Sequence, residues 1–353
     1  MTTPGGAGTT GGEPVLISVY VPLAVTAALT VFAPRMSRRL APRPAAWALA
    51  CAALVTAVGW TGSLALLAFT GVAQIPQVAA EGRWSVPALR AEDPVHLTVA
   101  VVSALTLLAG AVSLVLAAVR QAGHLLRARR ECARAPGDSQ LVVIDDDTPQ
   151  AFALPGAPGR IVVSRGMLRC LGNEEREALL AHERAHLRSR HHLFHILWRL
   201  TAAVNPLLRP LADAGGFALE RWADEEAAAE VGSRRVVARA VGRAALASAS
   251  RATSTPALAV TGGDVPQRVR ALLAPPPPRR TLPIAGGALL LTLCCASLAN
   301  AASDSDRMVD DAQRARCAAS LTPSSATRRD GFHDTPDVHC RHREPGEREG
   351  HGG

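Results

Sequence analysis

The sequence has no lysine, little charge and few aromatic residues. All 38 basic residues are arginine, and with the heavy use of Ala, Gly and Pro this points to a G+C-rich coding sequence rather than to a function. Aromatic residues make up 3% of the chain, too few for the stacking platforms that bind single-stranded nucleic acid. The seven cysteines form no CxxC pair, which excludes a zinc ribbon and a dense disulfide scaffold. With 48% hydrophobic and 19% charged residues, the chain is not wholly disordered.

The apolar residues are concentrated in four uncharged stretches that are long enough to cross a bilayer. These predicted spans are 15–33, 45–72, 95–119 and 282–301. Arginines follow the first and the third stretch and precede the fourth, and basic residues accumulate on the cytoplasmic side of membrane proteins. We therefore expect a multi-pass protein of the bacterial plasma membrane, embedded in the lipid bilayer, with its amino terminus and its carboxyl-terminal tail outside.

This pattern predicts a mainly α membrane protein with four transmembrane helices and a cytoplasmic α+β domain between the third and the fourth. Short strands are expected at 141–144 and 160–163, and helices at 174–190, with Asn173 as N-cap, and at 217–231. The segment 193–211 is either a set of helices lying against the membrane face or part of the soluble core. The predicted parts are a disordered amino terminus (1–14), a three-helix membrane region (15–119), the cytoplasmic domain (120–281), the fourth helix (282–301) and a disordered, polar, extracellular tail (302–353).

An HExxH motif marks the chemical centre of the cytoplasmic domain. Residues four apart on a helix lie on one face, so His182 and His186 can reach the same ion. Zinc suits two neutral imidazoles, because it needs only one more protein ligand to leave an open position. Glu183 then lies beside that position and can take a proton from water. The competing interpretation is a polar helix face rich in arginine.

A second pair of side chains at the same spacing supports the metal site. Glu220 and Asp224 also lie four apart on a predicted helix. Glu220 can supply the third ligand, and Asp224 can accept the proton on the other ring nitrogen of a ligating histidine. The alternative is a solvated acidic face continuing into Glu225 and Glu226. We therefore predict one Zn²⁺ per chain.

The two motifs together resemble the gluzincin pattern of the BlaR/MecR-type membrane zinc metallopeptidases and, more distantly, the HtpX and CAAX-prenyl-protease group. The segments 151–156 and 160–164 before HExxH, Asn205-Pro206 between the motifs and 268–273 before the last span stand in the family order. The resemblance implies a gluzincin-like metallopeptidase domain. It also implies that one strand binds substrate by edge addition, and the residues concerned are Ile161, Val162, Val163 and Ser164.

Two features depart from that family. Only about fifty polar residues follow the fourth span, so the extracellular penicillin-binding sensor of the β-lactam receptors is lacking. His191-His192 stands where relatives often have an acidic residue, and these two with His195 are candidates for stabilising an oxyanion.

The resemblance implies a membrane zinc endopeptidase whose substrate is a cytoplasmic regulator, such as a BlaI/MecI-like repressor, or a membrane-protein segment. The alternative is a non-catalytic signalling or scaffold protein that keeps the fold. Direct nucleic-acid binding is not expected, because no recognisable reading motif is present.

Overall fold

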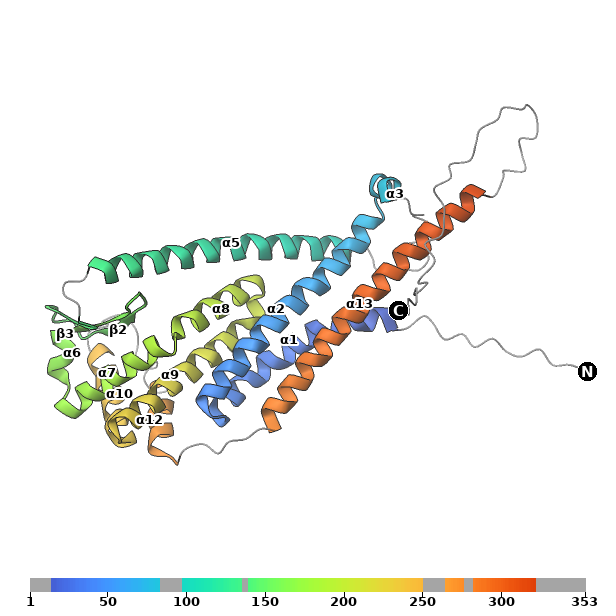
Figure 1. Ribbon diagram of the computed structural model, residues 1–353. Coiled ribbons are helices and arrows are strands. Elements are labelled where there is room, and N and C mark those ends of the chain that lie inside the picture. Colours follow the sequence, from blue (N-terminus) through green and yellow to red (C-terminus); the bar gives the residue numbers. More distant parts are fainter. Residues whose placement is uncertain (1–13, 83–96, 135–138, 250–263, 276–281, 322–353) are drawn as a thin grey trace, which may run out of the picture.

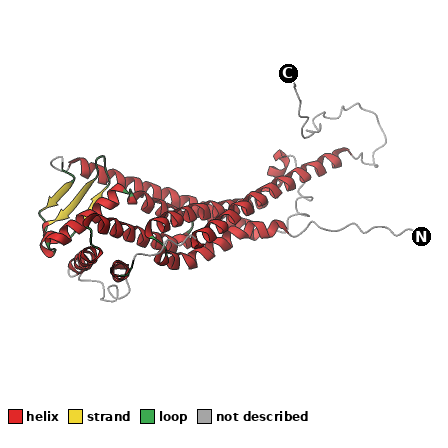
Figure 2. Ribbon diagram, turned by 60° about the horizontal axis from the view of Figure 1, so that its bottom comes forward, coloured by secondary structure: helices red, strands yellow, loops and turns green. Residues whose placement is uncertain are grey.

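The computed structural model describes residues 14–82, 97–134, 139–249, 264–275 and 282–321. The molecule is elongated, with a small sheet and the shorter helices at one end and long helices running toward the other (Figures 1 and 2). The long helices are α1 (Pro14–Arg39), α2 (Pro42–Ala73), α5 (Leu97–Arg134) and α13 (Leu282–Leu321), and a short α3 (Pro76–Gly82) follows α2.

Three helices in the described part of the chain are long and apolar enough to cross a membrane. They are Pro42–Ala73, Leu97–Arg134 and Ala285–Cys317. The first predicted span is also helical, as α1, although it does not meet this criterion over its described residues. The chain thus has the character of a membrane protein, and four passes with the amino terminus outside stay a prediction.

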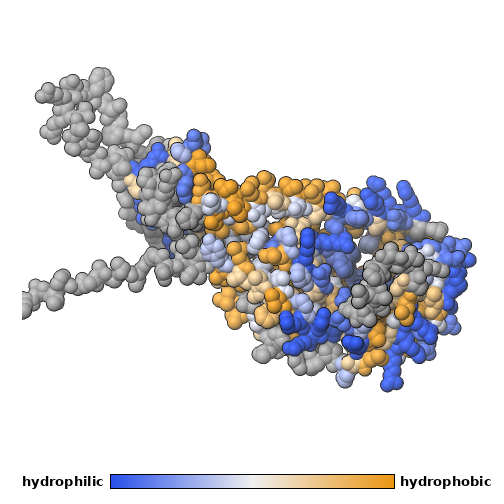
Figure 3. Space-filling model, turned by 180° about the vertical axis from the view of Figure 1, so that it is seen from behind, coloured by the Kyte–Doolittle hydropathy of each residue, from blue (hydrophilic) through white to orange (hydrophobic). Residues whose placement is uncertain are grey.

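The surface of α5 shows why a bilayer is needed. Large apolar side chains lie exposed along its first two thirds, among them Val102 at 61%, Leu108 at 62% and Val119 at 66%. An apolar band covers the middle of the molecule, and hydrophilic side chains gather toward its ends (Figure 3). Soluble monomers do not leave such a surface to water, whereas lipid tails cover it at no cost.

The helices run further than the apolar stretches predicted. α5 continues without a break to Arg134, so position 119 is not a structural boundary. The prediction of a disordered tail from 302 is wrong for residues 302–321, which extend α13. Arg307 pairs with Asp304, and Arg314 pairs with Asp311, at the i,i+3 spacing that supports a helix. The predicted termini 1–13 and 322–353 lie outside the described residues.

The sheet has three strands in the order β1-β3-β2. β1 (Leu141–Ile144) pairs parallel with β3 (Arg160–Ser164), and β2 (Ala151–Leu154) pairs antiparallel with the other side of β3. Ile161, Val162 and Val163 are buried, as expected of a central strand, whereas Phe152 on β2 is partly exposed. The two predicted strands are confirmed, and β2 is an additional strand.

Helices follow the sheet and build the rest of the domain. They are α6 (Arg165–Cys170), α7 (Asn173–Arg188), α8 (His191–Val204), the 3₁₀ turn η1 (Pro206–Leu208), α9 (Arg209–Val231), α10 (Arg234–Ala249) and α12 (Asp264–Leu273). The N-cap of α7 is Gly172 rather than the predicted Asn173, and its N–H donates to Glu175 Oε2 over 2.9 Å. Gly232, with φ of 78°, ends α9 in the left-handed conformation that favours glycine. The predicted α+β character of the domain is confirmed.

The ambiguous segment 193–211 forms a helical hairpin, α8-η1-α9, that packs among the long helices. Thr30 of α1 donates to the carbonyl of Leu207 over 2.9 Å, and the carbonyl of Val204 approaches Gly110 of α5. Trp198, Leu208 and other side chains of the hairpin share one apolar core with α1 and α2. The long helices α1, α2 and α5 therefore cover the hairpin, and it does not belong to a separate core of the domain.

Candidate metal centre

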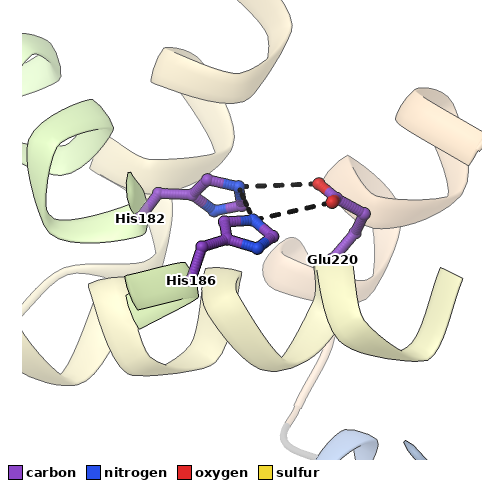
Figure 4. Close-up of side chains that lie close together, drawn as sticks. All are labelled: His182, His186 and Glu220. Carbon is purple, nitrogen blue, oxygen red and sulfur yellow. Dashed lines mark hydrogen bonds and ion pairs between the residues drawn. The ribbon is translucent and has the colours of Figure 1, made fainter. Parts of the chain in front are cut away.

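Three donor side chains meet between α7 and α9. His182 and His186 project from one face of α7, and Glu220 points at them from α9 (Figure 4). The two histidine Nε2 atoms are 3.1 Å apart, and each lies 3.5 Å from one carboxylate oxygen of Glu220. The i,i+4 spacing brings the histidines together, and the packing of α9 against α7 adds the carboxylate.

These distances fit a zinc ion. Zinc binds histidine nitrogen and carboxylate oxygen at about 2.0–2.2 Å, so the ligand atoms of a tetrahedral site lie about 3.4 Å apart. The 3.1 Å between the two Nε2 atoms is close to that value, each histidine has a different oxygen of Glu220 at 3.5 Å, and one donor atom from each residue lies within 4.8 Å of the others. Within the described residues, His182, His186 and Glu220 form the one group of histidine, cysteine or acidic side chains that could hold a metal ion.

A second layer of charged groups supports the donors. Asp224 Oδ1 lies 3.0 Å from Nδ1 of His182, which is the distance of an ion pair without the angle of a linear hydrogen bond. Arg268 of α12 donates to both oxygens of Asp224, over 2.8 and 2.7 Å, and its third nitrogen lies 2.8 Å from Glu220. One buried guanidinium thus fixes two carboxylates one helical turn apart, in the fork geometry that arginine provides.

His191 supports the other histidine. Its Nδ1 atom lies 2.9 Å from Nδ1 of His186, and its side chain is 1% exposed. If Nε2 of His186 binds the ion, its Nδ1 carries the proton and donates it to His191. His191 therefore takes the place of the acidic residue that its position suggested, and it is committed to His186 rather than to a substrate.

Burial and neighbouring charges give the two donor histidines different ionisation states at neutral pH. Burial disfavours the charged form of His182, but Asp224 and Glu220 outweigh it and raise its pKa to about 10. Burial and the neighbouring His182 lower the pKa of His186 to about 4. Burial opposes the charged form of Glu220 as well, yet His182 and Arg268 hold its pKa below the usual range. Two of the three donors are therefore ready to bind a cation at neutral pH.

Glu183 lies beside the donors and faces the sheet. Burial, opposed by His182 and Arg268, raises the pKa of its carboxyl group, and the backbone N–H of Ala153 in β2 is directed at it. Glu183 lines two cavities of about 350 Å³ each, one on either side of the donors. The cavity that also contains His195, His192 and Phe152 is called the site cavity below.

The strand beside the site is β2, not β3. β3 is paired on both sides, so the prediction that Ile161, Val162, Val163 and Ser164 bind substrate by edge addition is wrong. Ser164 is also committed, because its hydroxyl accepts from the backbone N–H groups of Met167 and Gln150. β2 pairs on one side only, and Ala151, Phe152 and Ala153 line the site cavity.

Arg268 is the residue that the sequence prediction missed. It lies 44 residues after Asp224 in the chain, and no local spacing connects the two. Two signals were available in principle. The segment 268–273 stands in the family order, and an arginine that lies on the buried face of an amphipathic helix requires an acidic partner.

Comparison with known families agrees with this geometry. Residues 119–214 match the model of Peptidase family M48. M48 peptidases are zinc-dependent, so the matched region has the character of a metallopeptidase. The match includes α7 with its HExxH motif and ends before Glu220. No curated protein and no solved structure matches the chain.

Proposed function

We propose that the chain is a membrane zinc endopeptidase of the BlaR/MecR type. The observation that carries the proposal is the group of two histidine nitrogens and the Glu220 carboxylate, close enough together to share one metal ion, with Glu183 directly beside them. A scaffold protein that only bound the ion would not require a carboxyl group there. His182, His186 and Glu220 would hold the zinc, and Asp224, Arg268 and His191 would orient them.

Zinc, when bound, supplies a Lewis acid that polarises the scissile carbonyl and activates water. Glu183 then takes a proton from the attacking water and passes it to the leaving amine. Burial favours this role. It raises the pKa of Glu183 toward neutral pH, and the carboxylate is therefore a stronger base than a solvated one. His195 lines the same cavity and is the histidine placed to donate to the carbonyl oxygen.

The substrate would be an extended peptide that adds to the free edge of β2. Strand addition supplies main-chain hydrogen bonds, and alternate side chains reach pockets on either side. The second cavity beside Glu183 has walls of small apolar side chains, including Ala240, Val241 and Ala244 of α10, which suit an apolar side chain next to the scissile bond. A cytoplasmic regulator such as a BlaI/MecI-like repressor, or a membrane-protein segment, would supply this peptide.

The test is zinc content together with cleavage by the full chain purified in detergent. We expect about one zinc per chain in the parent and in Glu183→Gln, and a clear loss in His186→Ala and Glu220→Ala. Glu183→Gln should lower the cleavage rate by about 10²–10⁴. Proteomes of cells with the parent or Glu183→Gln would then identify the substrate.

Two results would decide against the proposal. A folded parent that binds no added zinc would show that the donors are not a metal site. A Glu183→Gln variant with the parent's phenotype and proteome would favour the scaffold interpretation.

A further inference from the structure

A third cavity, larger than the two beside Glu183, lies next to the site cavity and is lined by basic side chains. It has a volume of about 630 Å³ and lies between α5, the loop 155–159 and the turn from α7 to α8. Its polar lining includes Arg129, Arg160, Arg190 and His192, and no acidic side chain is among the described residues that line it. We call it the basic cavity.

Two of its guanidinium groups have no counter-ion in the described part of the chain. Neither Arg129 nor Arg190 forms an ion pair or a side-chain hydrogen bond there, although most arginines of the domain do, such as Arg184 with Glu230. Burial, and then the charges of Arg129 and Arg190, lower the pKa of His192. Within the described residues, the charges of Arg129 and Arg190 are therefore not compensated by an acidic partner.

The walls of the basic cavity are held in place. Cys132 of α5 donates its thiol hydrogen to the carbonyl of Pro158 over 3.2 Å, and a Cβ at Gly156 would lie 2.6 Å from that sulfur. Arg190 has φ of 51° and is the one non-glycine residue with positive φ among the described residues. Arg190 directly follows the C-cap of α7, where the left-handed conformation commonly ends a helix, and this backbone conformation fixes where its side chain leaves the turn.

The basic cavity adjoins the site cavity. Pro155, Leu187 and His192 line both. Pro155 directly follows the end of β2, so a peptide paired with the edge of β2 passes from the metal centre toward Arg129 and Arg190. Leu125, Leu187 and Leu193 give the same cavity apolar walls that can cover the stem of a side chain.

Resting on the proposed function, we propose that the basic cavity is a specificity site that binds an acidic side chain of the substrate peptide, located beyond the end of β2 and to one side of the scissile bond. The two unpaired guanidinium groups supply charge-assisted hydrogen bonds to a carboxylate. The substrate class is therefore a peptide with aspartate or glutamate on one side of the cleavage site and an apolar side chain on the other.

The test measures binding to the full-length, zinc-loaded Glu183→Gln protein in detergent by fluorescence anisotropy. The probes are labelled decapeptides of alanine, serine and leucine with an Asp-Asp pair near either end, and their Asn-Asn analogues. We expect one of the Asp-Asp probes to bind about tenfold or more tightly than its analogue. The double substitution Arg129→Gln/Arg190→Asn should bring this ratio close to one. Asparagine is chosen at 190 because it tolerates the left-handed conformation.

The matched control is Arg130→Gln, which removes the neighbouring arginine of α5 that does not line the cavity, and it should keep the ratio of the parent. Equal binding of the Asp-Asp and Asn-Asn probes, or an unchanged ratio in the double variant, would overturn the proposal. If the ratio is lost in phosphatidylglycerol nanodiscs but kept in phosphatidylcholine nanodiscs, the cavity binds a lipid headgroup and the peptide proposal is wrong. Zinc content of each variant reports its folding.

The two proposals fail in different ways. If the probe preference depends on Arg129 and Arg190 but the parent cleaves no peptide of a proteome-derived library, the binding site for an acidic side chain is supported and the endopeptidase is contradicted. If the parent cleaves the library with no preference for an acidic residue on either side of the bond, the endopeptidase is supported and the specificity site is contradicted.

Discussion

Zinc binding to this site should release a proton from His182. Asp224 and Glu220 raise the pKa of His182 to about 10, so in the absence of a metal ion the imidazole is protonated at pH 7. A ligating histidine has to be neutral, and the ion must therefore displace that proton. His186, with its pKa lowered to about 4, releases none in this range.

The pH dependence of zinc affinity follows from the difference between the pH and the pKa of His182. With a pKa of about 10, the neutral form of His182 is roughly a 10⁻³ fraction at pH 7. Apparent zinc affinity should consequently rise about tenfold for each pH unit between 7 and 9, because protons compete less as pH increases. Competition with a chelator at several pH values gives the slope, and calorimetry in buffers of different ionisation enthalpy gives the number of protons released.

Asp224→Asn isolates the contribution of His182. This variant removes the charge that lies 3.0 Å from Nδ1, so the pKa of His182 falls and fewer protons are released on binding. Zinc affinity at pH 9 should drop about 10–100-fold through the loss of the orienting partner. Glu230→Gln removes an acid of the same helix that pairs with Arg184 at the surface, and it should change neither quantity. Equal proton release by the parent and Asp224→Asn would refute the reasoning.

Two further predictions concern stability, and thermal unfolding of the full chain in detergent checks both. Gly215→Ala should destabilise the protein by about 1–3 kcal/mol, because the new Cβ would lie 2.3 Å from the ring of Trp198. Gly216→Ala places its Cβ at an ordinary 3.9 Å from His195 and should stabilise the helix by about 0.5–1 kcal/mol. If both substitutions change the stability in the same direction, the packing described here is contradicted. Arg221→Met should cost about 2–3 kcal/mol, since the buried guanidinium donates to the carbonyls of Ser37, Arg38 and Leu40 at the end of α1. An unchanged melting temperature would show that this contact is dispensable.

The metal donors and the candidate base were predictable because their spacing along the chain is short. His182, Glu183 and His186 lie on one helix, and so do Glu220 and Asp224, so a period of 3.6 residues already places each set on one face. That the two faces meet is a tertiary fact. Each spacing alone left a solvated polar face as the alternative, and the prediction that Glu220 completes the site came from taking the two motifs together.

Features that depend on the order of the strands or on distant helices were not predictable in the same way. Ile161-Val162-Val163 is a continuous apolar run, which favours a central strand, yet the resemblance directed attention to it as an edge. Arg268 reaches Asp224 across 44 residues, and the turn that carries Arg190 shows no motif at all. The hairpin around Asn205 was ambiguous because membrane helices and a soluble core offer the same apolar surroundings to such a segment.

The continuity of α9 couples a donor of the candidate metal centre to the long helices. The helix begins at Arg209, at the tip of the hairpin between the long helices, and carries Glu220 eleven residues later, about 16 Å along its axis. A rotation of only 5° about the tip would displace Glu220 sideways by about 1.4 Å, which is enough to break its bond to an ion. Under the prediction that the long helices span a bilayer, its thickness and lateral pressure act on the hairpin from which α9 begins. Zinc affinity should then depend on the lipid composition around the protein and differ between detergents.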